Sequence, residues 1–198
     1  MLLNRLNRYR SKFIKILFLY LFLFFFQGMF FLLMADDNVE HRINIGLKLF
    51  PTIVGGNLNL GNKLNDDGKL LLLIAVKKNH TQAQIMEHTL RQTVNNIYKY
   101  PLSIKVTDNL FLQKNQNLKI AGIFISEKFP KNELQSIIDF GIKNKTIVFS
   151  PFTDDVEQGA HAGIFIRTQI KPALNITTIK KTGIRFNKLF LKVAKLYE

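Results

Sequence analysis

The chain has 198 residues, 47% of them hydrophobic, with a formal net charge of +14 and no cysteine. The absence of cysteine excludes a disulfide framework, a cysteine-ligated metal centre and the acylated cysteine of a lipoprotein. Its lysine surplus would suit a nucleic-acid-binding protein. The export signal described next argues against that class and favours a basic domain beside anionic lipid headgroups.

The N-terminus combines a basic segment with a long apolar run. Residues 1–15 contain five basic residues and no acid, and residues 16–35 are almost wholly apolar. This layout is typical of a secretory signal peptide, and about 20 apolar residues also suffice to cross a bilayer as a helix. Ala35 before Asp36 favours cleavage, whereas Leu33 is larger than usual at its position, and an uncleaved membrane anchor is the alternative. Either outcome predicts that residues 36–198 are exported.

Hydrophobic periodicity predicts alternating strands and helices in the exported part. Helices are expected at residues 38–54, 81–97, 132–144 and 187–197. Strands are expected at residues 69–76, 102–108, 119–126, 146–150, 163–169 and 171–177. A turn or short helix is expected at 178–182. Asn79 or Thr81 and Asn187 are the expected N-caps, and Gly141 is the expected end of the third helix.

This alternation predicts a single three-layer, Rossmann-like α/β domain over residues 36–198. Its sheet is expected to be mostly parallel, because strands separated by helices pair in parallel. The last two strands follow each other directly, and we expect them to form an antiparallel hairpin at the edge of the sheet.

No catalytic or cofactor-binding constellation stands out. The four histidines do not have metal-ligand spacing, and Ser150 has neither a Gly-x-Ser-x-Gly context nor an evident base. The segment from Gly159 to Gly163 lacks the pattern of a phosphate-binding or dinucleotide-binding loop, and an apolar alternation follows it instead of a helix. The sequence therefore predicts no enzyme activity, no cofactor and no metal, and a turn at this segment.

Two acidic residues follow the strand expected at 146–150. Asp154 and Asp155 lie in the loop after that strand, with His161 across a turn. Loops beyond the carboxyl ends of parallel strands are where α/β sheets bind ligands, so these three residues are a candidate ligand loop. The alternative, which the composition favours, is a solvated acidic turn.

The C-terminal helix is expected to be amphipathic. Helical spacing places Lys188, Lys192 and Lys195 on one side and apolar residues such as Leu189 and Val193 on the other. The favoured interpretation is a docked helix with a solvated basic face. The alternative is that the lysines contact lipid headgroups or an acidic partner.

The segment from KIAGIFIS (119–126) through TIVFSPF (146–152) to the helix at Asn187 resembles the YfiR-like periplasmic domains. Ser126 at a strand end, Gly159 in a turn, the pair around 171–176 and the lysine-rich final helix match that family. The resemblance implies a bacterial periplasmic domain without enzymatic activity. It also implies regulation of a membrane-bound signalling protein, of the diguanylate cyclase type, through its periplasmic sensor region. Redox control does not carry over, because this chain has no cysteine.

A small periplasmic solute-binding protein serving a transporter or sensor is the alternative function. Such proteins often contain two α/β lobes around a cleft, and the exported part is short for two. The identity of the partner or ligand and the oligomeric state are left open by the sequence.

Overall fold

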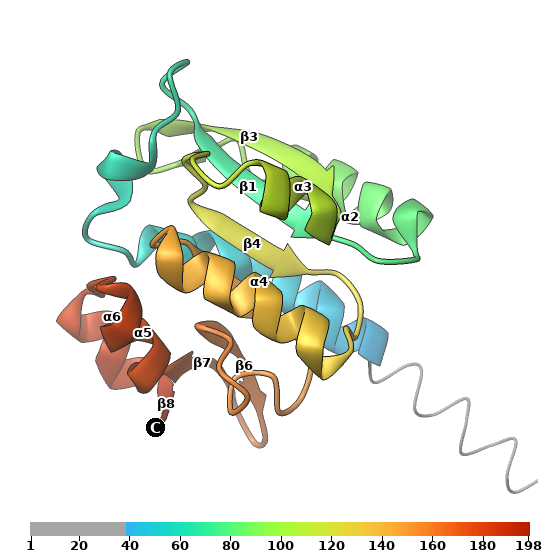
Figure 1. The fold of residues 1–198 in the computed structure, drawn as a ribbon. Coiled ribbons are helices and arrows are strands. Elements are labelled where there is room, and N and C mark those ends of the chain that lie inside the picture. Colours follow the sequence, from blue (N-terminus) through green and yellow to red (C-terminus); the bar gives the residue numbers. More distant parts are fainter. Residues whose placement is uncertain (1–38) are drawn as a thin grey trace, which may run out of the picture. The chain divides into compact units, whose positions relative to one another are not determined.

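A sheet of eight strands with helices on both faces organises residues 39–198, which a computed structural model describes (Figure 1). The segment expected to be a signal peptide or anchor lies outside these residues. By its internal contacts the chain divides into two units, Met1–His41 and Arg42–Glu198. The sheet and both hydrophobic cores belong to the second unit.

The predicted strands and helices alternate along the chain, but the helix predicted at 81–97 ends at Thr93, and the helix Asn109–Lys114 and the strands Asn96–Ile97 and Lys195–Tyr197 were not predicted. The strands are β1 (Leu70–Ala75), β2 (Asn96–Ile97), β3 (Tyr100–Thr107), β4 (Gly122–Ile125), β5 (Ile147–Ser150), β6 (Ala162–Ile166), β7 (Ile170–Asn175) and β8 (Lys195–Tyr197). The first helix covers residues 39–55, and the others are η1 (Leu60–Lys63), α2 (His80–Thr93), α3 (Asn109–Lys114), α4 (Lys131–Lys143), α5 (Ile176–Thr182) and α6 (Lys188–Val193).

The strand order is β2-β3-β1-β4-β5-β6-β7-β8. The strands from β3 to β6 are mutually parallel, and β6 and β7 form the expected antiparallel pair. The chain steps from β1 to β3 on one side and then crosses to β4 on the other. The switch point of this α/β sheet therefore lies between β1 and β4, where such sheets commonly bind ligands.

Two cores fill the space between the sheet and its helices. Residues 39–55 and α2 cover one face with Phe50, Ile53 and Leu90, while α4 covers the other with Leu134 and Ile137. The central strands contribute to both cores because successive side chains of a strand point to opposite faces. Every residue of β1, β4 and β5 is buried, as their continuous apolar runs predict.

The first helix packs unusually close to the sheet. The ring centroid of Phe50 lies 5.6 Å from that of Phe124 and 5.7 Å from that of Phe149. A Cβ atom on Gly122 would come within 2.8 Å of the Phe50 ring, so this approach requires glycine on β4. The aromatic trio thus fixes the helix over the centre of the sheet.

The C-terminal helix is shorter than predicted. Asn187 is its N-cap, with its side chain accepting a hydrogen bond from the Leu189 N–H, but the helix ends at Val193. The next residues form β8, which pairs in parallel with β7 and extends the sheet beyond the predicted hairpin. Lys195 therefore lies on a strand and not on the helix, so the prediction of three lysines on one helical face is wrong.

Gly141 does not end its helix. It lies inside α4, which continues to Lys143, and a Cβ atom there would meet Val148 Cγ2 at 2.6 Å and His161 Cε1 at 3.0 Å. The glycine is needed because α4 packs directly against β5 and the start of β6. The prediction of a glycine terminator is wrong, since close packing and not a left-handed turn selects this residue.

We expect Gly141→Ala to lower the free energy of unfolding by about 1–3 kcal/mol, because the added methyl overpacks this contact. Urea unfolding of the variant measures the change. Gln135→Ala, at an exposed position of the same helix, is the control and should alter stability by less than about 0.5 kcal/mol. Equal stability of the two variants would contradict the packing argument.

Candidate functional site

Asp155 is buried within the loop that follows β5. The Ser150 hydroxyl donates to Asp155 Oδ2 at 2.6 Å, and the Lys128 ammonium group pairs with Oδ1. The same Ser150 Oγ accepts the Phe152 N–H at 3.2 Å. Asp155 is fully buried, so the favoured prediction of a solvated turn is wrong for it. Through its contacts with Ser150 and Lys128, Asp155 stabilises the loop and is not exposed to a ligand.

His161 is also buried, beneath α5. Its Nε2 lies 2.7 Å from Thr182 Oγ1, and the Thr182 hydroxyl donates to the Thr178 carbonyl. The threonine oxygen therefore accepts a hydrogen bond from Nε2–H, which leaves Nδ1 as a buried acceptor without a partner. Burial lowers the pKa of His161 to about 3, so the ring is neutral at physiological pH. His161 is fully buried and does not line the cavity described next, so the structure does not bring it together with Asp154 as the prediction of a ligand loop requires.

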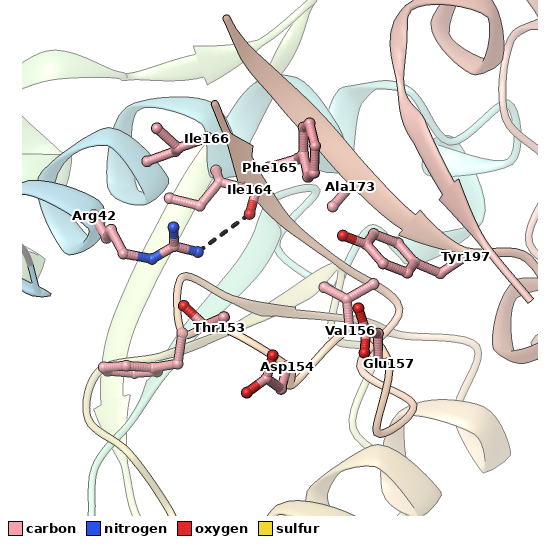
Figure 2. Close-up of a pocket in the computed structure, with 11 residues that line it drawn as sticks. Arg42, Thr153, Asp154, Val156, Glu157, Ile164, Phe165, Ile166, Ala173 and Tyr197 are labelled. Atoms are coloured by element: carbon pink, nitrogen blue, oxygen red, sulfur yellow. Dashed lines mark hydrogen bonds between the residues drawn. The ribbon is translucent and has the colours of Figure 1, made fainter. Parts of the chain in front are cut away.

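Asp154 is the member of the predicted ligand loop that lines a cavity. Its backbone is left-handed, with φ of 71°, and its side chain is exposed. The cavity has a volume of about 150 Å³ and lies beyond the carboxyl end of β5, beside the carboxyl-terminal half of β6. Its polar walls are Arg42, Asp154, Glu157 and Tyr197, and its apolar lining includes Phe152, Val156, Ile164, Phe165, Ile166 and Ala173 (Figure 2).

Arg42 comes from the start of the first helix and reaches across to the loop after β5. Its Nε donates to the Pro151 carbonyl at 2.9 Å and its Nη2 to the Ile164 carbonyl at 3.2 Å. Burial lowers the pKa of Arg42, and the charge of Asp154 acts in the opposite sense. The guanidinium remains charged because its ordinary pKa is far above neutrality. It joins the first helix to β5 and β6.

Tyr197 of β8 forms the opposite wall. Burial raises the pKa of its hydroxyl, and the negative charge of Glu157 adds to this effect. The phenol therefore keeps its proton and can donate a hydrogen bond. Figure 2 shows Arg42 and Tyr197 approaching the cavity from different elements, with Asp154 and Glu157 on the loop between them.

At the switch point between β1 and β4, a side chain of the protein accepts the backbone N–H groups that could otherwise bind an anion. One carboxylate oxygen of Glu127, just after β4, accepts the backbone N–H groups of Lys77, Lys78 and Asn79 at 2.7, 2.7 and 3.1 Å. Burial pushes the pKa of Glu127 upward, but these hydrogen bonds outweigh it and hold the pKa below its usual value. An internal carboxylate thus occupies backbone N–H groups at the place where such sheets commonly bind an anion. The cavity beside β5 and β6 combines charges of both signs with apolar walls and is the candidate site.

Sequence reasoning missed Arg42 and Tyr197. One signal was present for Arg42, because steps of four residues place it on the same helical face as Gly46 and Phe50. A charge on the core-facing side of a helix is unusual and indicates a functional or structural partner. Nothing local could have indicated Tyr197, since it had been assigned to a helix.

Lys188 and Lys192 are exposed on α6. Leu189 and Val193, expected on the opposite and core-facing side, are exposed with them. In residues 39–198, no three histidine or acidic side chains lie close enough together to hold a metal ion. Over the same residues, no helix has the length and apolar character needed to cross a bilayer.

No protein-family model matches the chain, and no curated protein matches it in sequence. Among solved structures, the chain is similar to the ligand-free, open form of CD0873, a substrate binding protein with adhesive properties from Clostridium difficile. The identity is 11%, the TM-score is 0.50, and the match covers 72% of this chain and 60% of that one. It is also similar to an ABC domain in complex with L-Trp from Streptococcus pneumoniae, with 12% identity, a TM-score of 0.48, and coverage of 73% and 62%.

The comparison with the substrate binding protein concerns the fold. It agrees with the α/β architecture described above, a mostly parallel sheet with an antiparallel pair and helices on both faces. This chain spans about 60% of the length of that protein. The resemblance to YfiR-like domains is not addressed by these matches and stays a prediction.

The buried histidine makes stability depend on pH. The folded state keeps His161 neutral down to about pH 3, whereas an unfolded histidine takes up a proton near pH 6.5. Stability is therefore fully present above pH 6.5 and falls as pH drops, by up to about 1.4 kcal/mol per pH unit from this group. Urea unfolding of the native chain and of His161→Leu between about pH 5 and pH 7 measures this slope.

We expect His161→Leu to lose most of that slope. His88→Leu, at an exposed position on α2, should retain it. If the native chain and His161→Leu lost stability in parallel over this range, the buried neutral histidine would be excluded as the cause.

The contacts of Asp155 predict a second stability effect. Asp155→Ala removes the acceptor of the buried Ser150 hydroxyl, and we expect a loss of about 1–3 kcal/mol. Asp154→Asn is the control in the same loop, because asparagine tolerates the left-handed backbone and the side chain is exposed. Chemical denaturation of both variants checks this, and a loss at Asp154 as large as at Asp155 would contradict the assignment.

Proposed function

We propose that the chain is a non-enzymatic solute-binding domain that acts outside the cytoplasm, with its ligand in the cavity between Arg42 and Tyr197. The observation that carries this proposal is the position of the cavity, beyond the carboxyl end of β5 and beside the carboxyl-terminal half of the parallel strand β6. Sheets of this kind bind ligands there. The fold similarity to a substrate binding protein supports the same conclusion.

The lining predicts the chemistry of the ligand. Arg42 offers positive charge to a carboxylate, and Asp154 and Glu157 offer negative charge to an ammonium group. Phe152 and Phe165 supply aromatic surface. The volume of about 150 Å³ is below the range of about 300–1,000 Å³ for drug-sized ligands. A small zwitterion with a short apolar part, or a small amine, fits these walls.

The cavity lies wholly within the unit Arg42–Glu198. Substrate-binding proteins with two lobes enclose their ligand in the cleft between them. Here Glu127 accepts the backbone N–H groups at the switch point, and the proposed site is built from one lobe alone. The chain spans about 60% of the substrate binding protein it resembles in fold.

Regulation of a membrane-bound signalling protein stays a prediction from the sequence resemblance, as does the absence of enzyme activity. The two functions are compatible, since a domain that binds a solute can pass the signal to a sensor. They differ in what the isolated chain does, because a solute-binding domain binds its ligand without a partner.

Binding of small solutes to the full-length chain tests the proposal. A panel of small zwitterions, amines and carboxylates is examined by saturation-transfer NMR, and each compound that binds is titrated by calorimetry. We expect a compound with an ammonium group to bind, and Asp154→Asn to weaken its binding about tenfold, the equivalent of about 1.4 kcal/mol.

Asp67→Asn makes the same chemical change at an exposed loop position outside the cavity and should leave the affinity unchanged. The proposal is wrong if no compound of the panel binds. It is also wrong if Asp154→Asn and Asp67→Asn bind the ligand as the native chain does.

A further inference from the structure

The helix α6 carries an exposed face that mixes positive charge with apolar side chains. None of its six residues is buried. Phe190 and Leu191 pack partly against the core, and Phe190 stacks on Phe186 at 5.4 Å between ring centroids. The opposite face consists of Lys188, Leu189, Lys192 and Val193, which we call the outer face of α6.

The apolar side chains of this face are exposed to solvent. Leu189 is 69% exposed and Val193 is 56% exposed. Single exposed apolar residues are ordinary, but here two occur one helical turn apart, beside two lysines that are also one turn apart. Lys195 and Leu196 of β8 follow directly and are exposed as well.

The C-terminal segment that contains this face is almost entirely positive in charge. Residues 176–198 contain six basic residues, Lys180, Lys181, Arg185, Lys188, Lys192 and Lys195, and one acid, Glu198. The hydrogen bonds and ion pairs of residues 39–198 give no carboxylate partner to Lys188 or Lys192. The complement of this face is therefore negatively charged and able to accept short aliphatic side chains.

We propose that the outer face of α6 rests on an anionic lipid bilayer. Headgroup phosphates attract the lysines, and the acyl boundary just below accepts Leu189 and Val193. A protein partner fits less well, because the cores of protein interfaces are rich in aromatic residues and arginine and poor in lysine. The outer face has lysine and aliphatic residues without an aromatic ring. This inference is independent of the proposed solute site.

The chain has no cysteine, so one introduced cysteine can be labelled uniquely. Leu189→Cys in the full-length chain carries a polarity-sensitive fluorophore and is mixed with vesicles of phosphatidylcholine alone or with added phosphatidylglycerol. The signal reports the position of this face, whatever residues 1–35 do with the same vesicles. Ile85→Cys on α2 is the matched control. The Ile85 side chain is 53% exposed, and α2 lies toward the other end of the sheet.

We expect a blue shift at position 189 on vesicles with phosphatidylglycerol, a smaller one on phosphatidylcholine, and none at position 85. Adding Lys188→Gln and Lys192→Gln to the labelled variant should lower the docked-to-free ratio about 30-fold, taking about 1 kcal/mol per lysine. The ratio should also fall with added salt, which screens the attraction.

Three outcomes would overturn the proposal. One is a label at position 189 that stays in a water-like environment while the chain sediments with anionic vesicles. A second is an equal shift on both vesicle types, or at both labelled positions. A third is a shift seen only with native envelope vesicles and abolished when protease removes their proteins, which would assign the face to a protein partner.

Discussion

The close approach of the first helix to the sheet is the constraint on which the candidate site depends. Phe50, Phe124 and Phe149 interlock at centroid distances of 5.5–5.7 Å, and glycine at position 122 allows the rings to meet. With the helix held there, Arg42 reaches the carbonyls of Pro151 and Ile164. Packing in the centre of the protein thereby sets the position of a charge two turns away, at the carboxyl end of the sheet.

Glu127 explains why the candidate site is not at the usual place. Backbone N–H groups at the start of a helix attract anions, and ligands of doubly wound sheets commonly exploit this. Here the protein supplies its own carboxylate, which accepts three N–H groups of the segment just before α2. The cavity bounded by Arg42, Asp154 and Tyr197 lies further along the sheet, at the carboxyl end of β5 and beside β6, where charges of both signs are brought together.

The sequence predicted the fold better than the site. Continuous apolar runs and three- to four-residue spacing located β1, β5, α2 and α4 because these signals are local. The length of the C-terminal helix was predicted wrongly. The spacing of Leu189 and Lys192 suits a helix, but this helix ends at Val193. The site depends on contacts such as Arg42 with Ile164, 122 residues apart, which no local pattern encodes. Asp155 looked like a surface acid because its partner Lys128 is distant in sequence.

One wall of the cavity belongs to a short edge strand of the sheet. Tyr197 belongs to β8, which has three residues and pairs with β7 alone among the described strands. Short terminal elements fray with far less free energy than the whole domain needs to unfold. Detachment of β8 would remove the tyrosine wall while both cores stay intact. Exchange of a bound solute would then be timed by fraying of this strand, and the affinity of the site would depend on how firmly β8 stays paired.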